Sequence, residues 1–472
     1  MDDLTLCYTP ATQLAAMLRR RVVSPVEVVE ACLRRIAQLN PRLLAYVTVA
    51  EEQARAAARA AEQAFLQGKP LGPLHGIPVS VKDLVPTAGI RTTFGSKIYE
   101  HFIPEEDGLI VQRLKAAGAI ILGKTNTPEF GAGANTYNAV CGATRNPWNP
   151  ALTCGGSSGG AAVALATGMG PLATGSDLGG SLRIPASFCG VVGFRTTPGL
   201  VPVYPSVLGW DTLSVQGPMA RTVADTALML SVIAGEDERV PISYPVDTRA
   251  FLRAVQRPQV AGLRVAWTPD LGGLLPVAAE VKAAVEAAVR VFADLGAVVC
   301  EATPDFSGVQ EIIHVTRAAG MITRHGDKLP QWREVMNPNL VWNIEQGAKL
   351  SARDWGLAEQ RRTELWLRVQ AFFRHYDLLL TPTVAILPFP VEESYPQAIA
   401  GHRVASYIDW FLFTYAITLT GLPAISVPCG WTAAGLPVGL QIVGRRRAET
   451  TVLRAAAAFE EAAPWAERRP PL

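Results

Sequence analysis

Two serine-bearing, glycine-rich turns and one lysine are the residues of this chain whose types and positions suggest chemistry. The first turn, residues 155–160, reads GGSSGG, and the second, residues 175–181, reads GSDLGGS. Glycine allows backbone conformations closed to other residues and lets another group approach the chain closely. Upstream, the apolar run 77–81 ends at Lys82. These features predict a place where backbone groups and serine hydroxyls meet a substrate.

A serine that attacks an amide needs a base, and a lysine can serve as that base only when its amine is neutral. The pKa of a free lysine is about 10.4, and burial lowers it. The neighbours of Lys82, in the sequence GIPVSVKDL, supply apolar surroundings of this kind. We therefore expect the rate of a reaction that uses Lys82 as its base to rise toward alkaline pH.

These motifs resemble those of the amidase signature family of serine hydrolases. The resemblance extends from about residue 24 to residue 459 and is weakest between about 235 and 377. The stretches that carry it are 76–83 (GIPVSVKD), 123–130 (GKTNTPEF), 142–148 (GATRNPW), 155–160 (GGSSGG), 175–185 (GSDLGGSLRIP) and 420–428 (TGLPAISVP).

The resemblance implies a role for each central residue. Ser181 is the nucleophile, Lys82 is the general base, and Ser157, whose preceding peptide bond the family holds in the cis form, relays protons between them. Stabilising the tetrahedral oxyanion is worth about 3–4 kcal/mol for each donor. The resemblance assigns this oxyanion hole to the backbone N–H groups of Leu178, Gly179, Gly180 and Ser181. It implies neither a cofactor nor a metal.

Residues around this centre are expected to support it. Asp177 and Arg183 would brace the nucleophile loop through charge-assisted hydrogen bonds. Ser158 is interpreted as a helix N-cap beside the relay serine. The residues expected to contact the substrate are Gly155, Gly156, Ile184 and Phe130.

Two positions depart from the family pattern. Cys154 stands where proline is common, and its thiol suggests sensitivity to thiol reagents. Ile184 stands where glutamine is common in the related glutamine-dependent amidotransferase subunits. An apolar residue there suits a hydrophobic or aromatic substrate, and the tryptophan-rich stretch 332–366 favours the same interpretation.

Other chemistries lack support in the sequence. The pattern G-x-S-x-G occurs only within the GGSSGG turn, around Ser157 and Ser158, and no histidine motif accompanies it. No Gly-Lys-Ser/Thr follows residues 155–160 as a phosphate-binding loop requires. No cluster has the spacing of metal ligands. The six histidines are dispersed and lie in no matching motif: His75, His101, His314, His325, His375 and His402.

The resulting hypothesis is an amidohydrolase that cleaves a linear amide through an acyl-enzyme on Ser181. Its substrate would be a small hydrophobic or aromatic amide, and anilides, carbamates, hydrazides or esters would suit the same groups. One alternative is the glutaminase (A) subunit of a tRNA-dependent amidotransferase, which would depend on a partner. The other is a non-catalytic scaffold, which the intact Lys82, Ser157 and Ser181 disfavour. A homodimer is expected only from the resemblance.

Composition limits the expected partners and the expected cellular compartment. The formal net charge is +2 and no basic block occurs, which argues against nucleic acid as the main partner. The seven cysteines form no C-x-x-C pair, which fits a reducing cytoplasm. No apolar run reaches the roughly 18 residues that span a bilayer, so no membrane association is expected.

The elements that would position these residues follow an α/β pattern. Helices are expected over 11–20, 24–39 and 51–67, as an N-terminal helical layer (1–68). From residue 71, β-branched runs alternate with helices, which predicts a mixed, largely parallel twisted sheet with helices on both faces, the amidase signature fold. We expect a single domain, 1–472, with its core in 69–234 and 378–463 and a variable, mainly helical insertion, 235–377, that shapes the substrate pocket.

Overall fold

One eleven-stranded sheet runs through the computed structural model, which describes residues 1–472. Its strands, in spatial order, are β1 (Tyr46–Val49), β3 (Ile120–Thr125), β2 (Pro78–Lys82), β6 (Leu172–Asp177), β8 (Val215–Ala220), β7 (Val192–Arg195), β14 (Ala424–Trp431), β15 (Pro437–Gly444), β11 (Leu378–Pro382), β9 (Arg264–Trp267) and β10 (Val298–Glu301).

The sheet is mixed, as the sequence predicted. Four of its neighbouring pairs are parallel and six are antiparallel. The parallel pairs lie on the two flanks, β3–β2–β6 and β11–β9–β10, where helical segments connect the strands. The sheet was expected to be largely parallel, but parallel pairs are the minority. A short connection such as the turn 432–436 between β14 and β15 can join only antiparallel strands.

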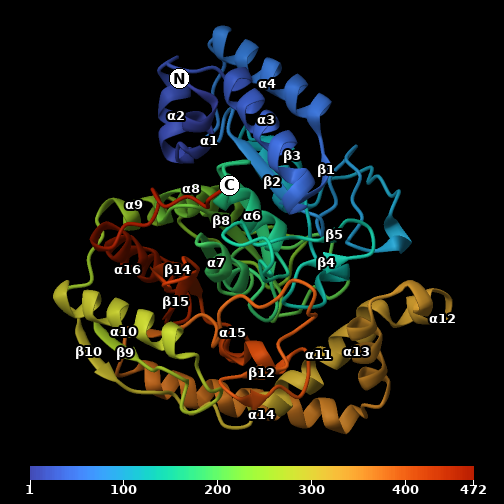
Figure 1. The fold of residues 1–472 in the computed structure, drawn as a ribbon, viewed down its shortest axis with the longest axis vertical. Helices are drawn as coiled ribbons and strands as arrows, with labels where there is room; N and C mark the ends of the chain where they lie inside the picture. The colour runs from blue at the N-terminus through green and yellow to red at the C-terminus, as the bar shows by residue number, and fades with distance from the viewer.

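Helices cover both faces of the sheet (Figure 1), which confirms the predicted layering. One face is covered by α5 (Leu109–Ala116), α8 (Val223–Ile233), α10 (Ala279–Asp294) and α16 (Glu449–Ala462). The other is covered by α4 (Glu51–Leu66), α6 (Gly159–Ala166) and α7 (Arg183–Cys189). Alternate residues of a strand face opposite sides, so Leu172 of β6 packs in the first layer and Ala173 in the second.

The N-terminal helices gather at one end of the molecule, at the top of Figure 1. They are α1 (Asp3–Tyr8), α2 (Ala11–Arg19), α3 (Pro25–Leu43) and α4. The start of α3 is fixed by a capping box, in which the Glu27 N–H donates to Ser24 Oγ and the Ser24 N–H donates to the Glu27 carboxylate. No helix of the chain combines the length and the apolar character needed to cross a bilayer.

Residues 235–377 add the last two strands at one side of the sheet and a group of helices. Strands β9 and β10 extend the sheet, and α9 (Arg249–Gln256) packs against α8 and α16. The remaining helices lie at the lower end of Figure 1, opposite α1–α4: α11 (Val309–His325), α12 (Leu329–Trp332), α13 (Pro338–Ala348) and α14 (Ala352–Phe373). Helix α11 contacts α13, α14 and α15 (Leu412–Thr420).

The two strands that carry the predicted site are parallel neighbours. Strand β2 ends at Lys82, and β6 ends at Asp177. The carboxyl ends of parallel strands meet at one edge of the sheet. The loop after β6 therefore leaves the sheet beside Lys82 and leads through Ser181 into α7.

Candidate active site

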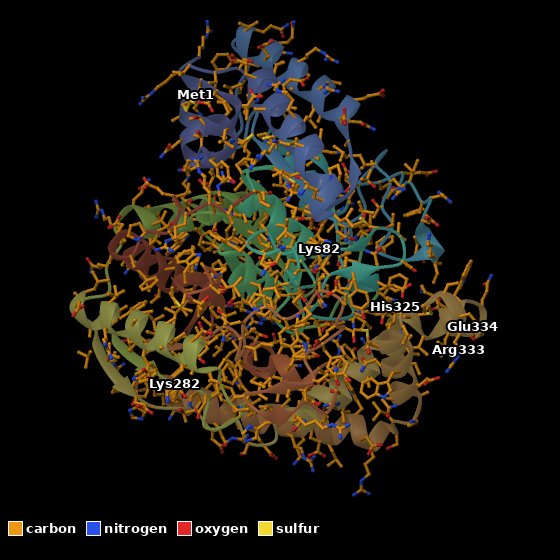
Figure 2. The ribbon with its side chains drawn as sticks, viewed as in Figure 1. Met1, Lys82, Lys282, His325, Arg333 and Glu334 are labelled. Carbon is orange, nitrogen blue, oxygen red and sulfur yellow. The ribbon has the colours of Figure 1, made fainter.

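The amine of Lys82 lies at the centre of a cluster of hydroxyl groups. Its Nζ donates to Ser157 Oγ at 2.7 Å, to Ser158 Oγ at 2.9 Å and to Ser176 Oγ at 2.9 Å. Lys82 is fully buried, near the middle of the molecule in Figure 2. Burial lowers the pKa of Lys82 to about 7, against a smaller opposing effect of the Asp177 carboxylate. A large fraction of the amine is therefore neutral at neutral pH.

Ser157 lies on the first glycine turn, immediately before α6. The peptide bond between Gly156 and Ser157 is cis, as the resemblance implies. A side chain on Gly156 would meet Thr136 Oγ1 at 2.9 Å and the Asn135 backbone at 3.0 Å, so only glycine fits there. Gly155 packs against Phe188 and Ile184. Both glycines thus lie behind Ser157 and do not line the cavity that it faces.

Ser181 lies on the second turn and lines the same cavity as Ser157 and Ser176. The two turns are tied together, because the Ser158 N–H donates to the Ser181 carbonyl at 3.2 Å. Gly180, at φ 128°, has no room for a side chain beside Thr414. The structure therefore brings all three predicted catalytic residues, Lys82, Ser157 and Ser181, into one place.

The four N–H groups expected to bind an oxyanion are not equivalent. The Gly180 N–H donates to Asp177 Oδ1 at 2.8 Å and is already occupied. The N–H groups of Leu178, Gly179 and Ser181 take part in no hydrogen bond with the rest of the chain. All three residues line the cavity. The N–H groups available to an oxyanion are therefore those of Leu178, Gly179 and Ser181. The Gly180 N–H instead holds the loop to Asp177.

A buried ion pair holds this loop in place. Arg183 donates to both oxygens of Asp177, at 3.0 and 2.9 Å, and Arg195 Nη1 lies 3.3 Å from Asp177 Oδ1. All three side chains are fully buried. Burial alone raises the pKa of Asp177, but the two guanidinium groups outweigh it and hold that pKa well below its usual value. Asp177 is thus a fixed anion that orders the loop through the N–H groups of Gly180 and Leu182.

The cavity in front of these serines has a volume of about 130 Å³. Ile184, which is fully buried, and Phe411 give it an apolar wall. Phe130 also lines it, with φ 50°, and stacks on His325 with ring centroids 4.4 Å apart. Of the four residues expected to contact a substrate, Ile184 and Phe130 therefore line the cavity, whereas Gly155 and Gly156 do not.

Helix α11, which lies within the insertion 235–377 expected to shape the substrate pocket, supplies a wall of the cavity through residues that the sequence analysis did not single out. Its contributing residues are Arg317, Met321, Arg324 and His325. Their spacing places them on one face of the helix. In the sequence, Arg317 and Arg324 on an otherwise apolar helix face were the only feature that could have indicated a cavity wall here. Burial, with Lys328 and Arg324 nearby, lowers the pKa of His325 to about 3, so this ring is neutral at physiological pH.

Two further expectations are revised by the contacts. Ser158 occupies the N-cap position of α6, but its hydroxyl makes no capping hydrogen bond and contacts Lys82. Ser176, which the sequence analysis did not single out, contacts the same amine. Cys154 is fully buried, and burial raises its pKa to about 12, so the expected reactivity of this thiol finds no support.

The chain is similar to known proteins along almost its whole length. The Amidase family model matches residues 27–453. An acylamidase of Rhodococcus erythropolis is 39% identical over 474 residues, covering 100% of this chain and 98% of that protein. A glutamyl-tRNA(Gln) amidotransferase subunit of Thermosynechococcus vestitus is 36% identical over 491 residues, covering 98% and 99%.

Solved structures agree as well. The crystal structure of a bacterial aryl acylamidase of the amidase signature family matches with a TM-score of 0.90 and 32% identity, over 97% of each chain. Sequence and fold thus correspond along almost the whole length. The chain belongs to the amidase signature family, hydrolases of the carbon–nitrogen bonds of linear amides.

Proposed function

We propose that the protein is an amidohydrolase that cleaves a linear amide through an acyl-enzyme on Ser181. The observation that carries this proposal is the 2.7 Å contact between Lys82 Nζ and Ser157 Oγ, in a cavity that Ser181 also lines. A neutral Lys82 amine takes a proton from Ser157, and Ser157 takes one from Ser181 as its oxygen attacks the carbonyl carbon.

The tetrahedral intermediate is stabilised by the backbone. Its oxyanion accepts hydrogen bonds from the N–H groups of Leu178, Gly179 and Ser181, each worth about 3–4 kcal/mol. The proton held by Lys82 then returns through Ser157 to the leaving nitrogen, the C–N bond breaks, and the acyl group remains on Ser181. A water molecule, activated by the same relay, hydrolyses this ester and restores the enzyme.

The apolar wall favours a small hydrophobic or aromatic acyl or amine group. Ile184, Phe411 and Phe130 present no hydrogen-bonding side chain to that part of the substrate. The relative named acylamidase and the structural neighbour named aryl acylamidase support amides and anilides as the first substrates to test.

Mass spectrometry tests the proposal. Wild type and Ser181→Ala are incubated side by side with a panel of amides, anilides, carbamates and esters, without metal or partner protein. We expect turnover by the wild type alone, with an acyl adduct on the peptide that contains Ser181. An adduct on another residue, or equal turnover by Ser181→Ala, would contradict the mechanism.

The glutaminase subunit of a tRNA-dependent amidotransferase is the second candidate. It is favoured by the 36% identity to one such subunit over nearly the whole chain. The apolar Ile184 counts against it, and no aspartate or glutamate lines the cavity to pair with the α-ammonium group of glutamine. Glutamine hydrolysis that requires the addition of partner proteins, together with no turnover of the panel, would establish this alternative.

A further inference from the structure

Arg317 is a buried cation without a counter-ion in the protein. The residue is only 5% exposed. Its Nε donates to the Tyr407 hydroxyl at 3.2 Å, and its guanidinium lies over the Tyr407 ring, 5.4 Å from the centroid. Besides Tyr407, the guanidinium interacts with the Tyr415 hydroxyl, and no carboxylate lies within ion-pair distance. Burial of a charge is costly unless it is paired, and the protein supplies this guanidinium with no charged partner.

Arg324, two turns further along α11, shows the contrast. Its guanidinium pairs with the Asp211 carboxylate and also donates to the Gly320 carbonyl at 3.3 Å. The protein therefore supplies a counter-ion for one cavity arginine and none for the other. The buried Tyr415 hydroxyl faces the Arg317 guanidinium and has no other partner in the protein.

The unpaired guanidinium lines the catalytic cavity. No aspartate or glutamate contributes to the cavity wall, and His325 is neutral, so Arg317 gives the cavity a positive charge. Arg317 and Arg324 also line a second cavity of about 360 Å³, beside the exposed Trp210. A substrate bound at Ser181 therefore shares its cavity with the Arg317 guanidinium.

We propose that Arg317 binds a carboxylate carried by the substrate, so that the enzyme prefers amides with an apolar body and one carboxylate. This inference rests on the function proposed above. Two terminal guanidinium nitrogens match the two oxygens of a carboxylate, and the Tyr407 contact at Nε fixes the plane of that fork. Arg317 is a specificity-determining residue, and Ile184 and Phe411 hold the apolar body.

Matched substrates test the preference and show which half of the substrate carries the carboxylate. Succinanilic acid is compared with butyranilide for the acyl half, and 4-acetamidobenzoate with 4-methylacetanilide for the amine half. We expect kcat/KM of the wild type to favour the carboxylate in one pair by about 10- to 100-fold, as expected for a hydrogen bond to a charged group in a buried site. Arg317→Met should remove that preference, because it lowers kcat/KM for the carboxylate-bearing member of the pair about 10- to 100-fold more than for the neutral member. Arg317→Lys should restore part of it.

The control is Arg361→Met, which removes an exposed arginine that pairs with Glu311 of helix α11. It should keep the wild-type preference. Equal kcat/KM for both members of both pairs would overturn the role of Arg317 while leaving the amidohydrolase function intact. An equal loss on charged and neutral substrates in Arg317→Met would reduce Arg317 to a structural role and overturn the inference as well.

Binding provides a readout that needs no turnover. Isothermal titration calorimetry with phenylacetate should show binding to wild type and to Arg361→Met, and at least about tenfold weaker binding to Arg317→Met. Phenylacetate that binds all three proteins equally, or none, would overturn the inference. If the wild type hydrolyses no member of the amide, anilide, carbamate and ester panel, the proposed function fails, and this titration still decides whether Arg317 is a carboxylate site.

Discussion

At the scale of single residues, the protonation of Lys82 should control the reaction. Only the neutral amine can accept a proton, and its pKa is lowered to about 7 by burial. The rate kcat/KM should therefore be low at acid pH and rise through an apparent pKa near this value. A pH–rate profile of the wild type checks this. A maximum at about pH 5 would contradict a lysine base.

Replacing Lys82 tests whether its amine is the base. Lys82→Met keeps an apolar stem but cannot accept a proton, so kcat should fall by about 10²- to 10⁴-fold. The exposed Lys282, on α10, is the matched control. Lys282→Met should keep both the rate and the profile, measured on the same amide. A Lys82→Met enzyme with wild-type kcat would remove Lys82 from the mechanism.

Ser176 should tune the lysine. It accepts one of the three hydrogen bonds of Lys82 Nζ, and an acceptor stabilises the charged amine. Ser176→Ala should therefore lower the kinetic pKa and reduce kcat by about five- to tenfold, the value of one hydrogen bond. The control is Ser231→Ala, because the Ser231 hydroxyl donates only to the Leu228 carbonyl within α8. A kinetic pKa that stays fixed or rises in Ser176→Ala would show that this hydroxyl does not act on the lysine.

The sequence allowed part of this site to be predicted. Lys82, Ser157 and Ser181 lie in motifs with distinctive local sequence, so a resemblance could identify them. Ser176 lies in the same motif, but its contact with Lys82 depends on the pairing of two strands that are far apart in the chain. Arg317 could not be placed, because its helix reaches the cavity only through tertiary packing.

At the scale of elements, the loop between β6 and α7 depends on Asp177. Asp177→Asn leaves Arg183 and Arg195 buried without a full counter-ion, so the free energy of unfolding should fall by about 3–5 kcal/mol. Urea unfolding measures it. Asp237→Asn, at a partly exposed pair with Arg239, should change it by less than about 1 kcal/mol.

The pH dependence of this contribution has a definite sign. The folded pKa of Asp177 lies below its unfolded value of about 3.9, so the carboxylate stabilises the protein above that pH. The contribution is lost as the pH falls through the lower folded pKa. The difference between wild type and Asp177→Asn should therefore be constant between about pH 6 and 8 and shrink only in strong acid. A difference that disappears near neutral pH would contradict the ion pair.

Most elements with a clear periodic pattern were predictable. The helix expected over 51–67 is α4, and the strand expected over 77–81 is β2. Among the elements that were not predicted are α7, whose seven residues include Pro185, and the four-residue strand β7. Both are too short for a periodic signal. Helix α7 is stabilised by packing between the sheet and α6, and β7 by its pairing with β8 and β14, rather than by local preference.

At the scale of the whole molecule, the cavity joins two parts of the chain that are distant in sequence. Residues 82–181 supply the reacting groups, and α11 supplies the facing wall. In Figure 2, Lys82 lies in the central part of the molecule, and His325 lies at the group of helices toward the lower end. A ligand on Ser181 should therefore stabilise α11 across the cavity, without affecting elements at the opposite end.

Hydrogen exchange tests this coupling. An aryl phosphonate that reacts with Ser181 fills the cavity and contacts Met321 and His325, so amide exchange in α11 should slow in the adduct, because the helix opens less often when its inner face is packed. Helix α4, which packs on α3 and β3 away from the cavity, should exchange at an unchanged rate. Ser181→Ala treated with the same reagent forms no adduct and should show no change in α11. Equally slowed amide exchange in α4 and α11 would instead indicate a general gain in stability. Unchanged exchange in α11 would mean that this helix does not form the wall that faces the nucleophile.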